Sequence, residues 1–280
     1  MNQLFYFWCS VQNRNPLAHL DPKLEIKHFK PNIHSESIDP RASPSRILSD
    51  LFWKTLPWNH ISQELGSLHV FDTGCGSGRY GSYLDTISHG LIESYKGIDV
   101  YEHADWKQRQ MNPKFSFEKS DGKRVLTCIP EKTNFFMSQS AIEHFPNDRR
   151  YFEQVNIFIR AHSNRSILQV HLIPSAACMA LYGRHGYRQY TPRTISTITR
   201  IFPNDRCFLF GLGGPACNRV HQEFITDPIL KTGEDLRNTK PDQYRTHVLK
   251  ALEEDATSTN NDPSFWALVV CSNWKQSFTL

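Results

Sequence analysis

The sequence VFDTGCGSGRYG, residues 70–81, constrains the fold more than any other stretch of this 280-residue chain. A short apolar run ends here and a stretch with helical spacing follows, so the glycines lie where a strand meets a helix. Gly74, Gly76 and Gly78 allow a sharp turn and a close approach of the backbone to a ligand. The first turn of the next helix offers free N–H groups and a positive dipole end. We therefore expect a ligand-binding loop at this position.

Short apolar runs alternate with helix-like stretches on both sides of this loop. The apolar runs are residues 68–73, 95–101, 115–122, 134–140 and 166–173, and the helix-like stretches are residues 78–87, 104–111 and 148–161. Such alternation is typical of a parallel sheet with crossover helices. Two later apolar runs, residues 207–213 and 265–272, are suitable as the last strands. The sequence therefore predicts an α/β fold.

The chain length suits one large α/β domain with extensions, because such domains reach roughly 200–250 residues. We expect residues 1–44, which contain four prolines and no sustained period, to form an irregular N-terminal arm. Residues 45–280 should form the domain, beginning with a helix from Ser45 to about Leu65 that covers one face of the sheet. A polar stretch at about residues 227–262 predicts a helical insertion.

Composition excludes several other classes of protein. The formal net charge of +4 does not demand a nucleic-acid or membrane partner. The seven cysteines are odd in number and contain no C-x-x-C pair, which argues against a disulfide framework. No histidines have the spacing of metal ligands, so we expect no metal. The apolar residues 4–8 are too short for a signal peptide or a membrane span. These features favour a soluble protein of the reducing cytoplasm.

Three acids follow three successive strands of the predicted sheet. Asp72 lies two residues before the first glycine, where a carboxylate suits the ammonium group of an amino-acid moiety better than a pyrophosphate. Asp99 ends the next strand and could accept hydrogen bonds from ribose hydroxyls. Asp121 ends the strand after that and could bind the exocyclic amine of an adenine ring. Strand ends on one edge would then present three carboxylates.

The glycines alone leave alternatives open. Gly76, Gly78 and Gly81 also satisfy G-x-G-x-x-G, the pattern of NAD(P)-dependent oxidoreductases. Asp72 favours a ligand with an amino-acid moiety over a dinucleotide. A non-catalytic module that keeps the fold and its cofactor is a third alternative.

Four stretches resemble successive motifs of class I S-adenosylmethionine-dependent methyltransferases, and their style is closest to that of the enzymes that act on small molecules. They are the loop at residues 70–81, GIDVYE, SDG and FFMSQSAIEHF. The similarity covers residues 68 to about 172. It implies a Rossmann-like sheet of seven strands in the order 3-2-1-4-5-7-6, with the last strand antiparallel and helices on both faces. It also implies S-adenosyl-L-methionine as the cofactor. The cofactor-binding residues that it implies are Asp72, Gly74, Gly76 and Gly78 for the methionine part, Asp99 for the ribose, and Val100, Tyr101, Asp121 and Gly122 for the adenine.

Methyl transfer from a sulfonium requires chiefly that the protein hold the nucleophile near the methyl carbon and exclude water. Ser138 and Gln139, at the end of the fourth strand, are expected beside the methyl position. A hydroxyl acceptor benefits from a base, and His144 is the first candidate. His171 is the second candidate, with a hydrogen-bonded core histidine as the alternative. The motif [DNS]-P-P-[YF], typical of enzymes that methylate amino groups, is absent, which favours O-methylation.

The segment YGRHGYRQYTPR lies within residues 174–205, where this fold often inserts a lid over the acceptor. We expect Arg184, His185, Tyr187 and Arg188 to bind the acceptor, because guanidinium groups pair bidentately with phosphate or carboxylate. Two alternatives stay open: a groove for single-stranded nucleic acid, and a solvated loop whose arginines pair with surface acids. The resulting prediction is O-methylation of a small-molecule or glycan-type acceptor, with an anionic acceptor as one option and RNA less favoured.

Overall fold

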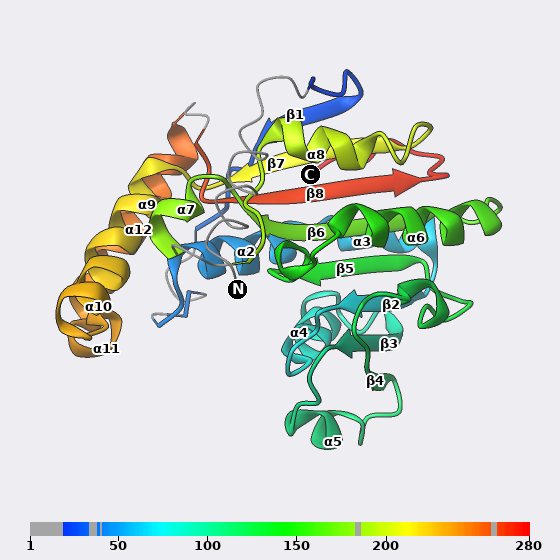
Figure 1. Cartoon of the computed structure of the whole chain (residues 1–280), viewed down its shortest axis with the longest axis horizontal. Coiled ribbons are helices and arrows are strands. Elements are labelled where there is room, and N and C mark those ends of the chain that lie inside the picture. The colour runs from blue at the N-terminus through cyan, green and yellow to red at the C-terminus, as the bar shows by residue number, and fades with distance from the viewer. Residues whose placement is uncertain (1–18, 34–37, 40, 183–185, 259–261) are drawn as a thin grey trace.

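The computed structural model describes residues 19–33, 38–39, 41–182, 186–258 and 262–280. An eight-stranded sheet in the order β1-β7-β8-β6-β5-β2-β3-β4 runs through the molecule (Figure 1). The strands are β1 (Leu24–His28), β2 (Leu68–Thr73), β3 (Ile92–Asp99), β4 (Phe115–Lys119), β5 (Phe135–Gln139), β6 (Ile167–Pro174), β7 (Arg206–Leu212) and β8 (Phe265–Ser272). Strand β8 is antiparallel to both of its neighbours, and all other pairs are parallel. Seven strands therefore end at the same edge of the sheet.

Seven of these strands lie in the order that the sequence resemblance implies, because β4-β3-β2-β5-β6-β8-β7 corresponds to 3-2-1-4-5-7-6. The predicted count and the order of the whole sheet are wrong by one strand. Strand β1 comes from the arm that we expected to be irregular, and it pairs in parallel with β7. An edge strand of five residues buries little: Leu24 is buried, but Ile26 is 48% exposed. Its apolar pattern is therefore weak in the sequence.

The helix expected from Ser45 to about Leu65 is two helices, α2 (Pro44–Thr55) and α3 (Trp58–Leu65). Pro57 separates them, because proline has no N–H group and disfavours a helical conformation in the residue before it. Helix α2 begins after Ser43, whose side chain accepts a hydrogen bond from the Arg46 backbone N–H. A serine at this position satisfies one of the free donors of a helix start.

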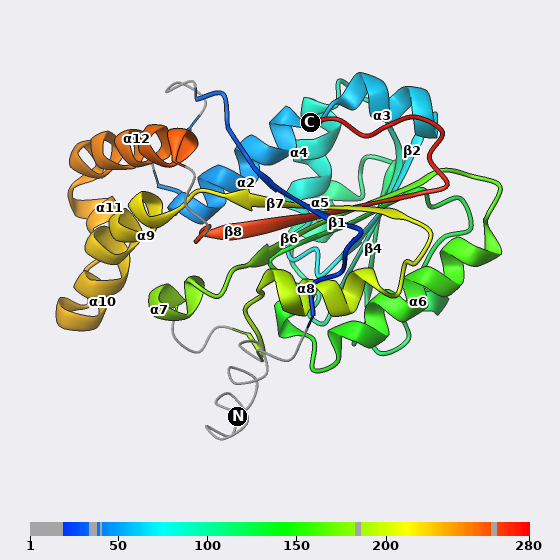
Figure 2. The ribbon, with the colours of Figure 1, turned by 90° about the horizontal axis from the view of Figure 1, so that it is seen from above.

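Helices cover both faces of the sheet, with α2, α3 and α4 (Arg79–Ile87) on one side and α6 (Asp148–Ala161) and α8 (Pro192–Thr199) on the other (Figure 2). Two apolar cores result, one on each face. Neighbouring residues of β2 show the division: Val70 packs in the core with Trp53 and Leu84, and Phe71 packs in the core with Phe152. This alternation follows from the period of two along a strand.

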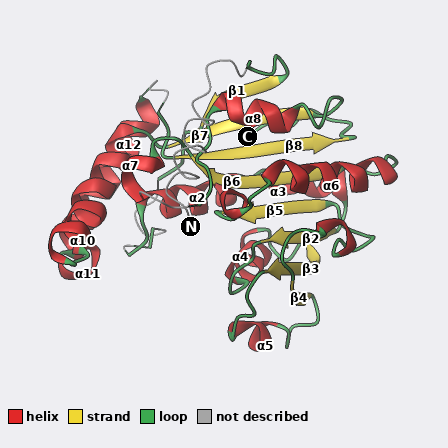
Figure 3. Ribbon diagram, in the orientation of Figure 1, coloured by secondary structure: helices red, strands yellow, loops and turns green. Residues whose placement is uncertain are grey.

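The connection between β7 and β8 is helical and lies at one end of the molecule (Figure 3). It consists of α9 (Pro215–His221), a π-helix (Gln222–Thr226), α10 (Asp227–Thr232), α11 (Leu236–Thr239) and α12 (Pro241–Thr257). The shorter elements elsewhere are α5 (Asp105–Arg109), the 3₁₀ helix η2 (Val125–Thr127), the 3₁₀ helix η3 (Ile142–His144) and α7 (Cys178–Tyr182). Over the described ranges, no helix has the length and apolar character needed to cross a membrane.

Candidate functional site

A cavity of about 1140 Å³ lies at the edge of the sheet where the parallel strands end. Its wall includes the residues that end β2, β3, β5 and β6, together with the start of α2. Ligands of open α/β sheets bind outside the carboxyl ends of the strands. The position of the cavity is therefore that of a ligand-binding site.

Ten of the predicted site residues line this cavity. They are Asp72, Gly74, Gly76, Asp99, Val100, Tyr101, Asp121, Gly122, Gln139 and His144. Five others lie outside its wall: Gly78, Ser138, His171, Tyr187 and Arg188. Arg184 and His185 lie outside the residues that the structure describes. The structure thus brings the three predicted acids together and separates most of the predicted acceptor residues from them.

The glycine loop has the left-handed backbone that the sequence predicts. Gly74 has a φ of +73°, and a Cβ atom there would lie 2.4 Å from the Cβ of Ala141. Gly76 has a φ of +54°, and nothing would crowd a Cβ atom at that position. Gly78 has a different task, since a Cβ atom there would lie 2.4 Å from the ring of Phe117. Gly78 therefore allows α4 to begin close to β4 and does not itself reach the cavity.

Asp72 is buried at the end of β2, with 1% of its surface exposed. The Tyr95 hydroxyl donates a hydrogen bond to Oδ2, whereas Oδ1 has no hydrogen-bond partner among the described residues. Burial raises the pKa of Asp72 to about 7, the Tyr95 hydrogen bond opposes this rise, and the charge of Asp99 adds to it. A buried carboxylate oxygen without a donor is costly. The site is therefore suited to a ligand with a cationic donor.

Asp99 joins the loop after β3 to the glycine loop. Its Oδ2 accepts a hydrogen bond of 2.8 Å from the Gly76 N–H, and its Oδ1 accepts one of 3.1 Å from the Tyr101 N–H. A carboxylate has about four lone-pair positions. Two of them therefore stay available to hydroxyl donors in the cavity.

Asp121, Val100 and Tyr101 form the outer part of this wall. The Asp121 side chain is 60% exposed and accepts a hydrogen bond of 3.0 Å from the Lys123 N–H. Hydrogen bonds from Lys123 hold the pKa of Asp121 below its usual value. Val100 and Tyr101 are 45% and 72% exposed, which is high for apolar side chains. Exposed apolar side chains next to a hydrogen-bond-accepting carboxylate are suited to binding a flat heterocycle.

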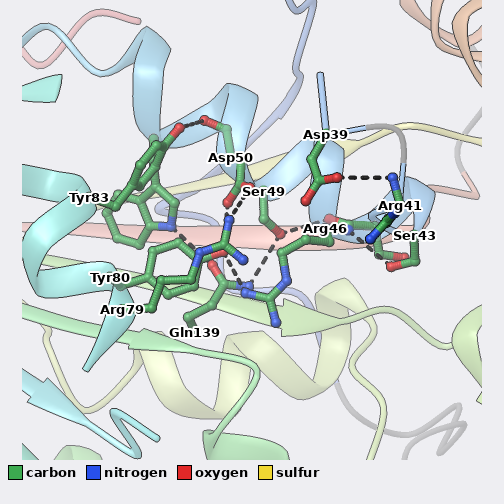
Figure 4. Close-up of polar contacts among 12 residues, drawn as sticks. Asp39, Arg41, Ser43, Arg46, Ser49, Asp50, Arg79, Tyr80, Tyr83 and Gln139 are labelled. Carbon is green, nitrogen blue, oxygen red and sulfur yellow. Dashed lines mark hydrogen bonds and ion pairs between the residues drawn. The ribbon is translucent and has the colours of Figure 1, made fainter. Parts of the chain in front are cut away.

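Gln139 is fixed by helix α2 (Figure 4). The Trp53 Nε1 donates to Gln139 Oε1 at 3.0 Å, and Gln139 Nε2 donates to Ser49 Oγ at 3.3 Å. Ser138 points to the other face of β5, because adjacent strand residues alternate. There its hydroxyl lies 2.8 Å from His171 Nδ1. The prediction that Ser138 lies beside the ligand is therefore wrong.

His171 is a core residue, which corrects the prediction of a second catalytic base. It is completely buried, and its ring lies edge to face against Tyr151 and Phe152. Burial lowers the pKa of His171 to about 3. The reason for the error is that β6 continues to Pro174, so that His171 lies inside the strand and not at its end.

His144, the other candidate base, lies at the cavity. It ends η3, and its side chain is 46% exposed. Its Nε2 lies 3.9 Å from Oε1 of Glu143, a fully buried acid whose pKa burial raises to about 8. The imidazole of His144 therefore combines access to a ligand with a carboxyl group behind it.

Arg188 and Tyr187, which are predicted to bind the acceptor, lie outside the cavity wall and make contacts within the protein. Arg188 donates to the carbonyl oxygens of Phe145 and Pro146 at 2.7 and 2.9 Å, and it lies 3.2 Å from Asp148. The Tyr187 N–H donates to the Glu143 carbonyl oxygen at 2.6 Å. Arginine composition alone could not show that these guanidinium donors fasten the segment to the loop after η3.

Helix α2 supplies cavity residues that the sequence analysis missed. Ser43, Ser45, Arg46 and Ser49 line the cavity from α2 and its cap, and Arg79, Tyr80 and Tyr182 line it from α4 and α7. We had expected this helix only to cover the sheet. Polar residues at 45, 46 and 49, which the helical spacing of three and four places on one side of α2, are the signal in the sequence.

No protein-family model matches the sequence, and a search of curated proteins finds no match. Solved structures do match. The plantazolicin methyltransferase BamL, in complex with a triazolic desmethylPZN analog and SAH, is 14% identical, with 81% of this chain and 85% of that chain covered and a TM-score of 0.50. A SAM dependent methyltransferase from Archaeoglobus fulgidus is 18% identical, with coverages of 82% and 95% and a TM-score of 0.47. The [4+2]-cyclase SpnF is 11% identical, with coverages of 96% and 95% and a TM-score of 0.47.

At this identity the similarity to BamL concerns the fold. The chain has the Rossmann-like fold of class I S-adenosylmethionine-dependent methyltransferases, with β1 as an additional edge strand.

Proposed function

We propose that this chain is an S-adenosylmethionine-dependent methyltransferase that methylates an oxygen of a small-molecule or glycan-type acceptor. The observation that carries the proposal is the buried Asp72 carboxyl group: the residue lines the cavity beside the glycine loop, and its Oδ1 has no donor among the described residues. An ammonium group in the cavity would supply that donor and would favour the ionised carboxylate. A nicotinamide dinucleotide has no such group to offer at this position.

The residues around Asp72 also fit the rest of the cofactor. Gly76 leaves the backbone open to the methionine part, Gly74 lets the loop pass close to Ala141, and Asp99 keeps lone pairs for the ribose hydroxyls. Val100 and Tyr101 would flank the adenine, with Asp121 and Gly122 at its edge. When bound, the cofactor supplies an electrophilic methyl group on a sulfonium. These assignments are part of the proposal.

The chain itself would position the acceptor and take its proton. Gln139, held by Trp53 and Ser49, gives the cavity a fixed polar surface at the end of β5. His144 is the proposed general base: an imidazole nitrogen would accept the hydroxyl proton as the oxygen attacks. Glu143, when ionised, would favour the charged imidazole, because its Oε1 lies 3.9 Å from Nε2. The walls would exclude water from this step.

Cofactor titration tests the proposal directly. We expect S-adenosylmethionine and S-adenosylhomocysteine to raise the melting temperature of the protein, and NAD and NADP to leave it unchanged. A ligand at a hundredfold excess over its dissociation constant stabilises by about 2.7 kcal/mol. Stabilisation by a nicotinamide nucleotide alone would contradict the proposal and support an oxidoreductase.

Turnover needs a second measurement, because binding does not distinguish an enzyme from a non-catalytic module. The protein with methyl-labelled cofactor is incubated with fractionated metabolite extracts, and labelled products are sought. We expect an acid- and base-stable methyl ether or a base-labile methyl ester. Strong cofactor binding with no labelled product in any fraction would support the non-catalytic module.

The proposal places the enzyme in the reducing cytoplasm. The described cysteines, Cys75, Cys128, Cys178, Cys207, Cys217 and Cys271, are all buried and free. Buried thiols without disulfides are the usual state of cysteine in a reducing compartment.

A further inference from the structure

We propose that the acceptor carries an oxyanion, a carboxylate or a phosphate, and that Arg46 of α2 binds it. This inference rests on the proposed function and specifies the substrate class of the same cavity. It replaces the lid arginines as the source of positive charge. We call Arg46, Ser45 and Tyr182 the α2 anion subsite, since all three line the cavity beside the start of α2.

The acids of the cavity wall gather in one part of it, whereas the basic residues are spread more widely, since Lys123 pairs with Asp121 and Arg150 of α6 also lines the cavity. Among the described residues of its wall the only acids are Asp72, Asp99 and Asp121, and each lies at or just after the end of β2, β3 or β4. The wall formed by α2 and the start of α4 instead carries Arg46 and Arg79. A ligand that fills both parts would therefore be cationic at one end and anionic at the other.

Arg46 is held in place by one edge of its guanidinium group (Figure 4). Its Nη1 donates a hydrogen bond of 2.6 Å to the Tyr80 hydroxyl, which in turn donates one of 2.7 Å to Asp50 Oδ1. The guanidinium carbon also lies 5.3 Å from the centre of the Tyr80 ring. A guanidinium group has five N–H donors. Within the described chain, Nε and Nη2 have no hydrogen-bond partner, so they can bind an oxyanion.

The charge around Arg46 is not balanced by the protein. Asp50 is shared between the Tyr80 hydroxyl and Arg79, whose Nη2 lies 3.6 Å from Asp50 Oδ2. Two guanidinium groups thus stand against one carboxyl group, and burial raises the pKa of Asp50. The positive end of the α2 dipole adds to the same potential. An anion in the cavity would compensate this excess.

Contacts of α2 place Ser45 and Ser49 toward β5 and β6, whereas the Arg46 guanidinium group contacts Tyr80 of α4, which follows the glycine loop. Ser49 binds Gln139 at the end of β5, and Ser45 accepts a hydrogen bond of 3.3 Å from Tyr182 of α7, which follows β6. The three acids proposed to bind the cofactor lie instead at or just after the ends of β2, β3 and β4. The acceptor therefore occupies the side of β5 and β6, and Arg46 lies on α2 between Ser45 and Ser49.

The cofactor's own carboxylate is a second source of the same chemistry, and the experiment separates the two. Isothermal titration measures the binding of S-adenosylhomocysteine and of 5′-methylthioadenosine, which lacks the amino-acid moiety. It then measures the binding of inorganic phosphate to protein saturated with S-adenosylhomocysteine. The variants are Arg46→Gln, Arg46→Lys and, as a matched control, Arg149→Gln. Arg149 is an exposed arginine that pairs with Glu153 on α6.

We expect Arg46→Gln to weaken phosphate binding by about tenfold or more and to leave both nucleosides within about twofold of wild type, because one charged hydrogen-bonding group is lost. Arg46→Lys keeps the charge but not the fork, and should lose only part of the affinity. Arg149→Gln should change nothing. Urea unfolding of each variant verifies that the fold is intact, and Arg46→Lys carries the test if Arg46→Gln does not fold.

Two results would overturn the inference. The first is that phosphate does not bind wild-type protein saturated with S-adenosylhomocysteine, or that it binds the Arg46→Gln variant equally well. The second is weaker binding of S-adenosylhomocysteine but not of 5′-methylthioadenosine to Arg46→Gln, which would assign Arg46 to the cofactor carboxylate. If wild type binds neither nucleoside, the proposed function fails and the acceptor role of Arg46 fails with it.

Discussion

The two walls of the cavity are built in different ways. The wall with the acids comes from residues 72–122, a single stretch of chain in which each strand end follows the last. The opposite wall takes the start of α4 from within that stretch and combines it with α2, the loop after β5, α7 and the beginning of β8, which are far apart in the sequence. The first wall can be predicted from local motifs, whereas the second exists only after the elements have packed.

Arg188 and Arg46 show the same contrast in single residues. Both are arginines near tyrosines, and composition favours Arg188 because its segment is rich in both types. The structure gives the Arg188 guanidinium group two carbonyl acceptors and one carboxylate, whereas the Arg46 guanidinium group has only the Tyr80 hydroxyl as a hydrogen-bond partner in the described chain. The number of arginines in a segment therefore says less about binding than the number of their donors that stay unused.

The largest effect is expected in the acidic wall. Replacement of Asp99 by Ala should weaken the binding of S-adenosylhomocysteine about a hundredfold, since hydrogen bonds to a charged group contribute about 1.5–3 kcal/mol each. It also removes the acceptor of the Gly76 and Tyr101 N–H groups. Isothermal titration measures the change, with the exposed Asp105→Ala as the control. Wild-type affinity in Asp99→Ala would show that the cofactor is not held by this wall.

A smaller effect, with opposite signs for binding and stability, is expected for Asp72→Asn. The pKa of Asp72 is about 7 in the folded chain and lies above its ordinary value of 3.8, so folding favours the protonated form. Wild-type stability therefore falls as the pH rises from about 4 to 7, and it is fully lowered above 7. Asparagine avoids this cost, so the variant should gain roughly 2–4 kcal/mol of unfolding free energy at pH 8 and little at pH 4.

The same substitution should weaken cofactor binding about tenfold, because the ammonium group loses a charged acceptor. In wild type, affinity for S-adenosylhomocysteine should rise as the pH increases through 7, since the ligand requires the ionised carboxylate. Urea unfolding at the two pH values and titrations between pH 5.5 and 8 measure both effects. If Asp72→Asn lowers stability at pH 8, the folded protein stabilises the ionised Asp72 carboxylate and the expected cost of burying its charge is contradicted.

The sequence was sufficient for most of the fold because the strand and helix periods are clear in the middle of the chain. The predicted helix from Asp148 to Ala161 and the predicted strand at residues 265–272 have the observed bounds. The edge strand β1 was missed because one partner strand buries too little apolar surface to produce a pattern. The break at Pro57 was missed although proline is a known interruption of helices.

The site could be predicted only where its residues come from one continuous stretch of the sequence. The resemblance placed Asp72 and Asp99 on one edge, since parallel strands end together. The reasoning from strand ends failed at Ser138, where adjacent strand residues alternate between cavity and core, and at His171, which lies inside β6 and not at its end. Arg46 could not be assigned, because its partner Tyr80 is 34 residues away and belongs to another helix.

A moderate effect on stability alone is expected in the segment that composition favoured. Arg188→Gln should lower the free energy of unfolding by about 1–2 kcal/mol, because it removes two hydrogen bonds and a largely buried ion pair with Asp148. The corresponding fall in melting temperature is about 2–8 °C. Arg193→Gln, at the exposed start of α8, is the comparison. Unchanged melting temperature with weaker acceptor binding would restore Arg188 to the acceptor site.

The smallest effect is expected at the outer rim of the acidic wall. Tyr101 is 72% exposed, so Tyr101→Ala removes a ring that, in the proposed binding mode, would cover the adenine from one side only. We expect a loss of affinity for S-adenosylhomocysteine of about threefold to tenfold, since a stacking contact contributes about 0.5–1.5 kcal/mol. Tyr101→Phe keeps the ring and should bind like wild type. Because the Tyr101 backbone N–H still binds Asp99, the ribose contacts survive, and a larger loss would mean that the two walls close together when the cofactor binds.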